Sequence, residues 1–361
     1  MKSKKNSGLN FFIIFFKGKL TDTTTRWEIN MVAYRTLGKS GLKVSEIGLG
    51  CWAIGGPSFS DDGFPNGWTG NNDVESKVAL HRAYELGVNH WDTADVYGRG
   101  HSERLIGQVF QEGVKRDQIV LATKVGWFKG TAAQAFDPLH IRHQLEQSLK
   151  NLQTDYVDIY YFHNPFFGDN NIFLEQAVAE MQRLKQEGKI RVIGQSAYDF
   201  DKFVQLLPIT GVEVLQLPYN ALKSPFDSPE KNIFKWADSH DLGLVLFGTY
   251  AKGLLLDKYD PQNPPQFERG DIRNTYEDFK TEFIKRLKPA LLKIEKRFGA
   301  GPQTLALVCN QYALSKSRHA VVIPGFKNAD QMEINTTTMA KPLQPADLEF
   351  ITSVFSEFKG I

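Results

Sequence analysis

The sequence predicts a (β/α)8 barrel of the TIM type, and two observations lead to this prediction. Short apolar segments bounded by turn residues alternate with longer segments of helical periodicity from residue 47 onward, which is typical of a parallel sheet covered by helices. Several of the apolar segments also end in a polar side chain, as they do in barrels whose active site lies at the carboxyl ends of the strands. The 361 residues are enough for one such domain.

The predicted elements follow in order along the chain. A β-hairpin over 34–45, turning at Gly38 to Gly41, precedes the barrel. The eight predicted strands are 47–52, a strand ending at Asp92, and then 119–124, 156–163, 190–196, 214–220, 244–248 and 320–324. The predicted helices are 73–86, 102–111, 138–152, 175–187, 200–207, 230–240, 285–298 and 303–314. Two long loops, 56–72 after the first strand and 256–281 after the seventh, are expected to cover a ligand.

The first thirty residues differ from the rest of the chain. Their apolar core, 9–16, is too short to span a membrane and is followed by no small-residue cleavage site. We expect residues 1–30 to be a disordered extension and 31–361 to form the barrel domain. No later segment has the length and hydrophobicity of a membrane span.

Composition excludes several classes of function. Charged residues make up 23% of the chain and the formal net charge is +2, with no basic stripe, so nucleic acid is not an expected partner. The two cysteines, Cys51 and Cys309, lie far apart, which indicates neither a disulfide framework nor a metal site. This usage fits a reducing compartment, and we expect a cytoplasmic protein with no membrane partner. The sequence leaves the oligomeric state open.

Four proton-handling residues follow three successive predicted strands. Asp92 ends one strand and Tyr97 follows it, Lys124 ends the next, and His163 ends the third. A lysine ammonium favours a neighbouring tyrosinate and so lowers the tyrosine pKa. An aspartate would hold the lysine, and a histidine would orient a substrate carbonyl. Together they predict a general acid directed at a carbonyl oxygen, which needs a hydride from a cofactor.

The stretch Asp92-Thr-Ala-x-x-Tyr97-Gly-x-Gly-x-Ser-Glu103 resembles the first signature of the aldo-keto reductases. Lys124 in Ala-Thr-Lys-Val and His163 after Asp-Ile-Tyr-Tyr-Phe complete that family's tetrad, and the resemblance runs from about Tyr34 to the C-terminus. It implies that Tyr97 donates the proton, Lys124 lowers its pKa, Asp92 holds Lys124, and His163 orients the carbonyl.

The resemblance also implies where a nicotinamide cofactor binds. Ser196 and Gln216 match the residues that hold the carboxamide, although Ala197 stands where the family has asparagine, and Phe247 matches the ring that stacks on the nicotinamide. The stretch at 323–335 is similar to the adenosine-binding segment, where Lys327 would meet a ribose 2′-phosphate, so NADPH is expected; Ile334 replaces the usual acid. The other cofactor-binding residues expected are Gly50, Cys51, Trp52, Asp92, Gly248, Thr249, Lys252, Gly253, Leu254, Gly325, Gln331 and Asn335.

Gly50 also belongs to a stretch, Gly48-Leu-Gly50-Cys-Trp-Ala53, that formally matches the dinucleotide fingerprint. A polar loop follows it instead of a helix, so the Rossmann context is missing. A close approach of the backbone to a ligand at Gly50 is still expected, because glycine allows it.

The resemblance thus implies an NADPH-dependent oxidoreductase that reduces an aldehyde or ketone to an alcohol. The expected substrate pocket, suited to a small apolar or aromatic carbonyl, consists of Trp52, Trp68, Tyr97, Trp127 and His163. Three alternatives remain open from the sequence: an NADP-dependent sugar or cyclitol alcohol dehydrogenase, a nucleotide-sensing regulatory subunit with incidental turnover, and a barrel of unrelated chemistry such as a lyase.

Overall fold

The computed structural model describes residues 32–223, 225–336 and 342–358. The predicted extension, residues 1–30, lies outside the described residues, so both its disorder and the domain boundary stay predictions. Among the described residues, no helix has the length and hydrophobicity to cross a membrane, and no group of histidines, cysteines and acids is arranged to hold a metal ion.

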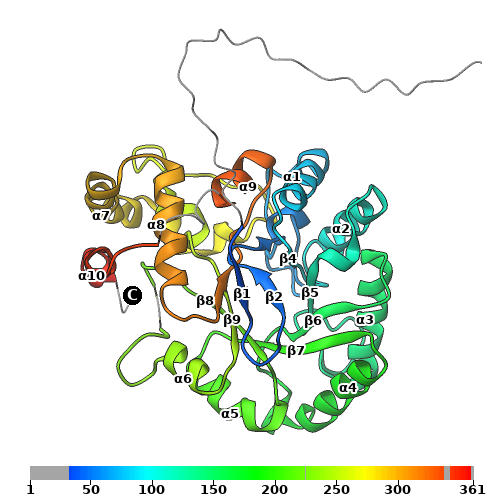
Figure 1. Cartoon of the computed structure of the whole chain (residues 1–361). Helices are drawn as coiled ribbons and strands as arrows, with labels where there is room; N and C mark the ends of the chain where they lie inside the picture. Colours follow the sequence, from blue (N-terminus) through cyan, green and yellow to red (C-terminus); the bar gives the residue numbers. More distant parts are fainter. Residues whose placement is uncertain (1–31, 224, 337–341, 359–361) are drawn as a thin grey trace, which may run out of the picture. The chain divides into compact units, whose positions relative to one another are not determined.

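Eight parallel strands form one sheet in which each strand pairs with the next along the chain. The first and last strands are also joined, because Gly48 N–H donates to Val322 O at 2.8 Å and Gly50 N–H donates to Pro324 O at 3.1 Å. The sheet therefore closes on itself, and the predicted (β/α)8 barrel is confirmed (Figure 1). The strands are β3 (Leu49–Gly50), β4 (His90–Asp92), β5 (Val120–Val125), β6 (Val157–Phe162), β7 (Ile190–Ser196), β8 (Val214–Pro218), β9 (Gly243–Phe247) and β10 (Ala320–Val322).

Side chains fill the barrel interior. The buried cluster there includes Ala122, Ile159, Tyr161 and Val192 from three neighbouring strands. Tyr161 lies across β7 at Gly194, where an added Cβ would come within 2.3 Å of the tyrosine ring, so only glycine fits. Because apolar side chains close the interior, the polar residues that handle protons gather at the carboxyl edge of the sheet.

The helices cover the outside of the barrel (Figure 1). They are α1 (Asp73–Glu85), α2 (His101–Gln111), α3 (Pro138–Leu152), α4 (Leu174–Gln186), α5 (Phe200–Thr210), α6 (Ile233–Ser239), α7 (Thr281–Phe298), α8 (Pro302–Leu314), α9 (Ala329–Thr336) and α10 (Pro345–Val354). Polar side chains cap the N-termini of two helices. The Asn72 side chain accepts hydrogen bonds from backbone N–H groups of α1, and the Asp137 side chain accepts them from α3, whose first residue is Pro138.

The main differences between the structure and the predicted elements concern four helices. Helix α5 continues through Pro208 to Thr210, and α7 begins at Thr281 with Pro289 inside it. Helices α9 and α10 were not predicted. Helix α10 packs on α7 through Arg297 and Asp347, whose closest atoms lie 2.7 Å apart. Both helices are amphipathic only weakly, so their sequence pattern gave little signal.

The predicted hairpin is confirmed as β1 (Tyr34–Thr36) and β2 (Lys43–Ser45), which pair antiparallel. Its Leu37 and Val44 are fully buried in the same cluster that fills the barrel. Lys39 N–H donates to Asp241 O, just before β9 begins. The hairpin therefore closes the amino-terminal end of the barrel, opposite the end where the catalytic tetrad was predicted.

The two long loops bind each other. We call the pair, residues 56–72 and 256–281, the strap. Gly67 N–H donates to Gly270 O at 3.1 Å, and Ile272 N–H donates back to Gly67 O at 2.9 Å. The Asp271 carboxylate accepts from both the backbone and the hydroxyl of Thr69, at 2.8 and 2.9 Å. The second loop is only partly irregular, because it contains the short 3-10 helices η5 (Ile272–Thr275) and η6 (Glu277–Phe279).

Candidate active site

Lys124 lies at the centre of the polar residues at the carboxyl end of the barrel. Its ammonium donates to Asp92 Oδ1 at 2.5 Å and to the carbonyl of Thr93 at 2.6 Å, and it lies 3.3 Å from the hydroxyl of Tyr97. The lysine is fully buried. Neighbouring strands bring these residues together, because β4 ends at Asp92 and pairs in parallel with β5, which carries Lys124.

Tyr97 is held by the tight turn that follows β4. Its N–H donates to Ala94 O at 3.1 Å. Gly98, with φ +59°, follows it so closely against Gly55 that a Cβ there would lie 2.0 Å from the Gly55 carbonyl oxygen. This packing fixes the tyrosine beside the lysine, where a proton donor was predicted.

His163 follows β6 and faces Tyr97. The two rings meet edge to face with centroids 5.8 Å apart. The backbone N–H of His163 donates to Val125 O. The Nδ1 atom of its ring is buried and has no hydrogen-bond partner among the described residues. The structure thus brings all four predicted residues, Asp92, Tyr97, Lys124 and His163, to one place.

Burial dominates the electrostatics of these groups. It raises the pKa of Tyr97 well above its usual value, and the nearby Asp92 carboxylate adds to the rise. The Lys124 ammonium favours the phenolate, but in this arrangement desolvation outweighs it.

The same desolvation acts on the other two groups. It lowers the pKa of Lys124, against the opposing effect of Asp92. It also lowers the pKa of His163 well below its usual value, and the charge of Lys124 contributes to this. At neutral pH the site therefore contains a neutral imidazole, which can donate one hydrogen bond, and a phenol that retains its proton.

Three tryptophans surround the tyrosine and histidine. Trp52 stacks on Tyr97 with centroids 5.8 Å apart, and Trp68 meets Trp52 edge to face at 5.6 Å. Trp127 meets the His163 ring at 6.3 Å and is 48% exposed. All the residues predicted for the substrate pocket therefore gather around the tetrad, and Trp127 forms its solvent-facing side.

The residues expected to hold the nicotinamide carboxamide are Ser196 at the end of β7 and Gln216 in the middle of β8. Ser196 and Gln216 are both buried, and Ser196 pairs with Gln216 in the sheet register. Gln216 Nε2 donates to Asp92 Oδ2 at 2.7 Å, so it ties this side of the site to the Lys124 ion pair. Phe247 ends β9 and meets Tyr198 edge to face at 5.9 Å.

Gly50 and Cys51 have structural roles in the barrel wall. A Cβ at Gly50 would lie 2.5 Å from the Ile323 carbonyl oxygen, so the backbone at this glycine approaches the segment that follows the last strand; the approach to a ligand stays a prediction. Cys51 N–H donates to Asp92 O at 2.9 Å, and burial raises the pKa of the Cys51 thiol, which makes it unreactive.

The segment after β9 forms a backbone cradle. Left-handed conformations occur at Gly248, Ala251, Lys252 and Gly253, with φ of 69°, 46°, 56° and 94°. Consecutive N–H groups in such turns make an anion-binding concavity. Burial lowers the pKa of Lys252 to about 8, and its ammonium lies 3.8 Å from the centroid of the Tyr276 ring.

Two of the predicted cofactor residues in this segment are engaged elsewhere. The Thr249 hydroxyl donates to Asn310 Oδ1 of α8 at 3.0 Å, and Leu254 is buried in the outer apolar layer. Their side chains therefore anchor this segment to α8 and to the apolar layer.

The expected adenosine segment leads into α9. Lys327 donates to the Thr69 carbonyl in the strap, and burial lowers its pKa to about 8. Gln331 Oε1 accepts from Lys327 N–H at 3.1 Å. Asn335, expected at the adenine, donates to Gly325 O at 3.1 Å and accepts from the Tyr250 hydroxyl at 2.8 Å, so its side chain fixes this segment to the cradle.

The family model of the aldo/keto reductases matches residues 46–355. This chain belongs to the aldo/keto reductase family. Aldo-keto reductase YhdN of Bacillus subtilis is 28% identical over 327 residues, which cover 89% of this chain and 93% of that protein. L-galactose dehydrogenase of Arabidopsis thaliana is 28% identical over 318 residues, which cover 86% of this chain and 89% of that protein.

A solved structure of an aldo/keto reductase has the same fold. The holo form of aldo-keto reductase AKR11C1 from Bacillus halodurans superposes with a TM-score of 0.70 and is 27% identical. The match covers 90% of this chain and 96% of that one. Family membership makes this chain an oxidoreductase.

Two basic residues near the cradle were missed by the sequence reasoning. The Lys258 ammonium lies against Gly253, 2.8 Å from where a Cβ would be. Arg273 pairs with Asp271 at 2.6 Å and lies over the Trp68 ring, 4.6 Å from its centroid. Both residues belong to the long loop 256–281, whose sequence has no periodic pattern from which the position of a basic side chain could be predicted.

The nicotinamide cofactor used by aldo/keto reductases fits the residues present. Three lysines are partly buried, and desolvation lowers the pKa of each: Lys252, Lys258 and Lys327. A bound anion would offset this cost of burying a positive charge. Within the cradle at 248–253, Ala251 N–H donates to Gly248 O and Gly253 N–H donates to Tyr250 O, and Phe247 ends the strand that precedes it.

Proposed function

We propose that this protein is an NADPH-dependent carbonyl reductase that converts a small aldehyde or ketone to an alcohol in the cytoplasm. The observation that carries the proposal is the buried contact of Lys124 with Asp92 and Tyr97, facing His163. Such a constellation places one protonated phenol, backed by one buried cation, beside an imidazole that can orient a carbonyl oxygen.

In this mechanism the bound cofactor supplies a hydride to the carbonyl carbon. The neutral His163 imidazole donates a hydrogen bond to the carbonyl oxygen and orients it. Tyr97 gives its proton to the same oxygen as negative charge develops there. Lys124 stabilises the phenolate that remains, and Asp92 keeps Lys124 charged despite its burial.

The preference for NADPH over NADH is proposed from the basic residues around Thr69. Lys327 lies at the position where the family resemblance implies contact with the 2′-phosphate, and its ammonium donates only to an uncharged carbonyl. Burial is the main cause that lowers the pKa of Lys327. The charges of Arg273 and Lys258 lower it further, whereas those of Asp271 and Glu268 raise it. A dianionic phosphate would relieve this concentration of positive charge.

Two other functions in this family are supported by specific observations. An alcohol dehydrogenase would use the same four residues in reverse, and one relative is named L-galactose dehydrogenase. A nucleotide-sensing protein would need slow cofactor release, which the hydrogen-bonded strap favours. Product analysis with NADP+ and alcohols, and the cofactor release rate, separate these from a reductase.

The test is fluorescence titration with NADPH and NADH, followed by turnover of 4-nitrobenzaldehyde by wild type and Tyr97→Phe. We expect tighter binding of NADPH. We also expect kcat to fall by about 10²- to 10⁴-fold in Tyr97→Phe, because the ring is kept and the proton donor is lost. Unchanged turnover in the variant would exclude Tyr97 as the donor, and binding without turnover would favour the sensing role.

A further inference from the structure

Tyr161 lies inside the barrel, next to Lys124. Its side chain is fully buried among the interior residues. Lys124 of β5 pairs with Tyr161 of β6 in the sheet register, and the Lys124 ammonium lies 5.9 Å from the centroid of the Tyr161 ring. A phenol hydroxyl is costly to bury unless a polar group meets it. The neighbours of this hydroxyl therefore matter for the site.

Gly194 allows the Tyr161 ring to cross the neighbouring strand. The two residues pair in the register of β6 and β7, and a Cβ at Gly194 would lie 2.3 Å from the tyrosine ring. Beyond β7, Val214 of β8 belongs to the same buried cluster as Tyr161. Two residues further along β8, Gln216 also faces the interior, because it reaches Asp92 on the other side of the barrel. Tyr161 therefore extends across β7 toward the strand that carries Gln216.

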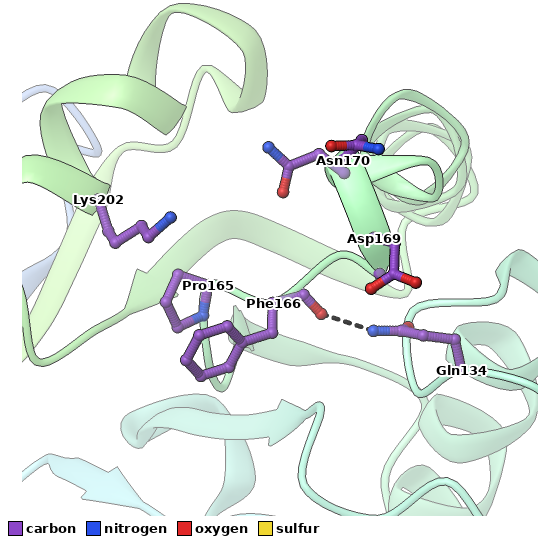
Figure 2. Close-up of a pocket in the computed structure, with 8 residues that line it drawn as sticks. Gln134, Pro165, Phe166, Asp169, Asn170 and Lys202 are labelled. Carbon is purple, nitrogen blue, oxygen red and sulfur yellow. Dashed lines mark hydrogen bonds between the residues drawn. The ribbon is translucent and has the colours of Figure 1, made fainter.

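The strand that carries Tyr161 is fixed at its carboxyl end. The Gln195 side chain of β7 donates to the carbonyl of Asn164 at 3.0 Å. Figure 2 shows the turn that follows, where Gln134 Nε2 donates to Phe166 O at 2.5 Å. The position of the Tyr161 hydroxyl is therefore set by the barrel itself, before any ligand is bound.

The side-chain amide of Gln216 has two N–H groups that need acceptors. One of them donates to Asp92 Oδ2 at 2.7 Å. A carboxylate can only accept, so the amide atom that faces Asp92 is Nε2 and not Oε1. The second hydrogen of the same nitrogen needs another acceptor in the barrel interior.

The Tyr161 oxygen is the neighbour that can supply this acceptor. Among the described residues no hydrogen bond of regular geometry reaches the Tyr161 hydroxyl. The Gln216 amide nevertheless acts on it: burial and the charge of Asp92 raise the pKa of Tyr161, whereas Gln216 lowers it. A hydrogen-bond donor lowers the pKa of a phenol, because it favours the phenolate. The nitrogen end of the amide is therefore the end that lies toward Tyr161.

We propose that the Tyr161 oxygen is the second acceptor for the Gln216 amide, which makes Tyr161 a positioning residue for cofactor binding. With one N–H directed at Asp92 and the other at Tyr161, the remaining polar atom of the amide is Oε1, which only accepts. The carboxamide of a nicotinamide has a matching donor in its NH2 group. The proposal rests on the function proposed above, which assigns Gln216 to that carboxamide.

The test is the Kd of NADPH in Tyr161→Phe, measured by fluorescence titration. The variant keeps the ring against Gly194 and Lys124 and removes only the oxygen. We expect Kd to rise about three- to tenfold, because the Gln216 amide becomes free to turn. In a Gln216→Met background the same change should alter Kd less than about twofold, because the amide through which it acts is absent. Equal effects in both backgrounds, or none in either, would overturn the proposal.

Tyr160→Phe is the matched control. Tyr160 precedes Tyr161 on β6 and is also fully buried, but its hydroxyl donates to Ile141 O of α3 at 3.3 Å, outside the barrel. This variant should leave the Kd of NADPH unchanged. The 3-acetylpyridine analogue of NADP+ has a methyl group in place of the carboxamide NH2, so wild type and Tyr161→Phe should bind it equally. A weakening as large as that found with NADP+ would contradict the proposed role.

Thermal unfolding of the cofactor-free protein separates this inference from the proposed function. The decrease in Tm of the double variant Tyr161→Phe/Gln216→Met should be smaller than the sum of the two single decreases, because both changes remove the same contact. That result supports the contact even if the wild type binds no NADPH. Additive decreases, or a higher Tm in Tyr161→Phe as expected for an unpartnered buried hydroxyl, contradict it even if the wild type reduces 4-nitrobenzaldehyde normally.

Discussion

Burying the Lys124 ammonium costs free energy, yet the proposed mechanism requires this residue beside Tyr97. An ammonium taken out of water needs matched acceptors, and Asp92 and the Thr93 carbonyl supply them at 2.5 and 2.6 Å. Its remaining contact is with the Tyr97 hydroxyl. In the proposed mechanism the lysine therefore acts on the state of Tyr97 after proton transfer, when the oxygen carries a negative charge.

Replacing Lys124 with methionine should raise the pKa of Tyr97 further, because the charge that favours the phenolate is gone. In the alcohol-oxidation direction the enzyme needs the phenolate, so the rise of kcat with pH should move to higher pH. We expect kcat at pH 7 to fall by about 10²-fold or more. The measurement is the pH profile of NADP+-dependent oxidation in wild type and variant, and an unmoved profile would contradict the assigned role.

Asp95 leads to a second prediction at this scale. It is buried two residues before Tyr97, and neither carboxylate oxygen has a hydrogen-bond partner among the described residues. Burial raises its pKa well above the usual value, and Glu103 adds to the rise. A carboxyl whose pKa is raised on folding contributes stability at low pH, and this contribution is lost as pH increases through the folded-state pKa.

Asp95→Asn should therefore raise the melting temperature by a few degrees at pH 8 and much less at pH 5. Thermal unfolding at both pH values measures the difference, with the exposed Glu349→Gln as the control. The same gain at both pH values would show that the pKa of Asp95 is not raised in the folded protein.

At the scale of elements, the strap joins two loops that are about 200 residues apart in sequence. Burial alone would raise the pKa of Asp271, but hydrogen bonds from Arg273 and Thr69 lower it to about 2. The carboxylate therefore remains charged at neutral pH. Because Lys327 also donates to Thr69, the strap is connected to the adenosine segment.

Asp271→Asn should loosen the strap, because it leaves Arg273 without its ion pair and weakens the contact with Thr69. We expect NADPH to dissociate roughly tenfold faster, measured by stopped-flow fluorescence. Asp61→Asn breaks an exposed ion pair with Arg99 in the same loop and should leave the rate unchanged. Equal rates in wild type and Asp271→Asn would mean that the strap does not retain the cofactor.

At the scale of the whole molecule, the two ends of the barrel have separate tasks. In the proposed function the carboxyl end carries the chemistry, and the amino end is closed by the hairpin. Arg35 of β1 fastens that closure: it pairs with Glu46 at 2.7 Å and donates at 3.0 Å to the carbonyls of Leu314, Ser317 and Ala320.

Arg35→Ala should lower the free energy of unfolding by about 2 kcal/mol, because several carbonyls lose their shared donor at once. The kcat should not change, because the residue lies at the end of the barrel away from Tyr97. Denaturant unfolding and steady-state kinetics of the same preparation test both statements. A fall in kcat at full folding would show that the two ends are coupled.

The sequence was sufficient for the barrel and for the gathering of the tetrad, since strand periodicity and parallel pairing place strand ends on one edge. The sequence was not sufficient to predict that Lys258 and Arg273 lie near the cradle, because their positions depend on how the strap folds. It also could not show that Asn335 is engaged by Tyr250, or that Gly50 is required by the neighbouring strand. These contacts join distant segments and leave no local pattern.

The burial of Lys124 has a consequence for chemical labelling. All three hydrogens of its ammonium face acceptors, and the side chain has no exposed surface. Amine-reactive reagents should therefore modify the surface lysines and leave this one untouched in the folded protein. Lys124 would be acylated only when the barrel opens locally. The rate of its labelling, measured by mass spectrometry, would therefore report the rate of local unfolding at this site.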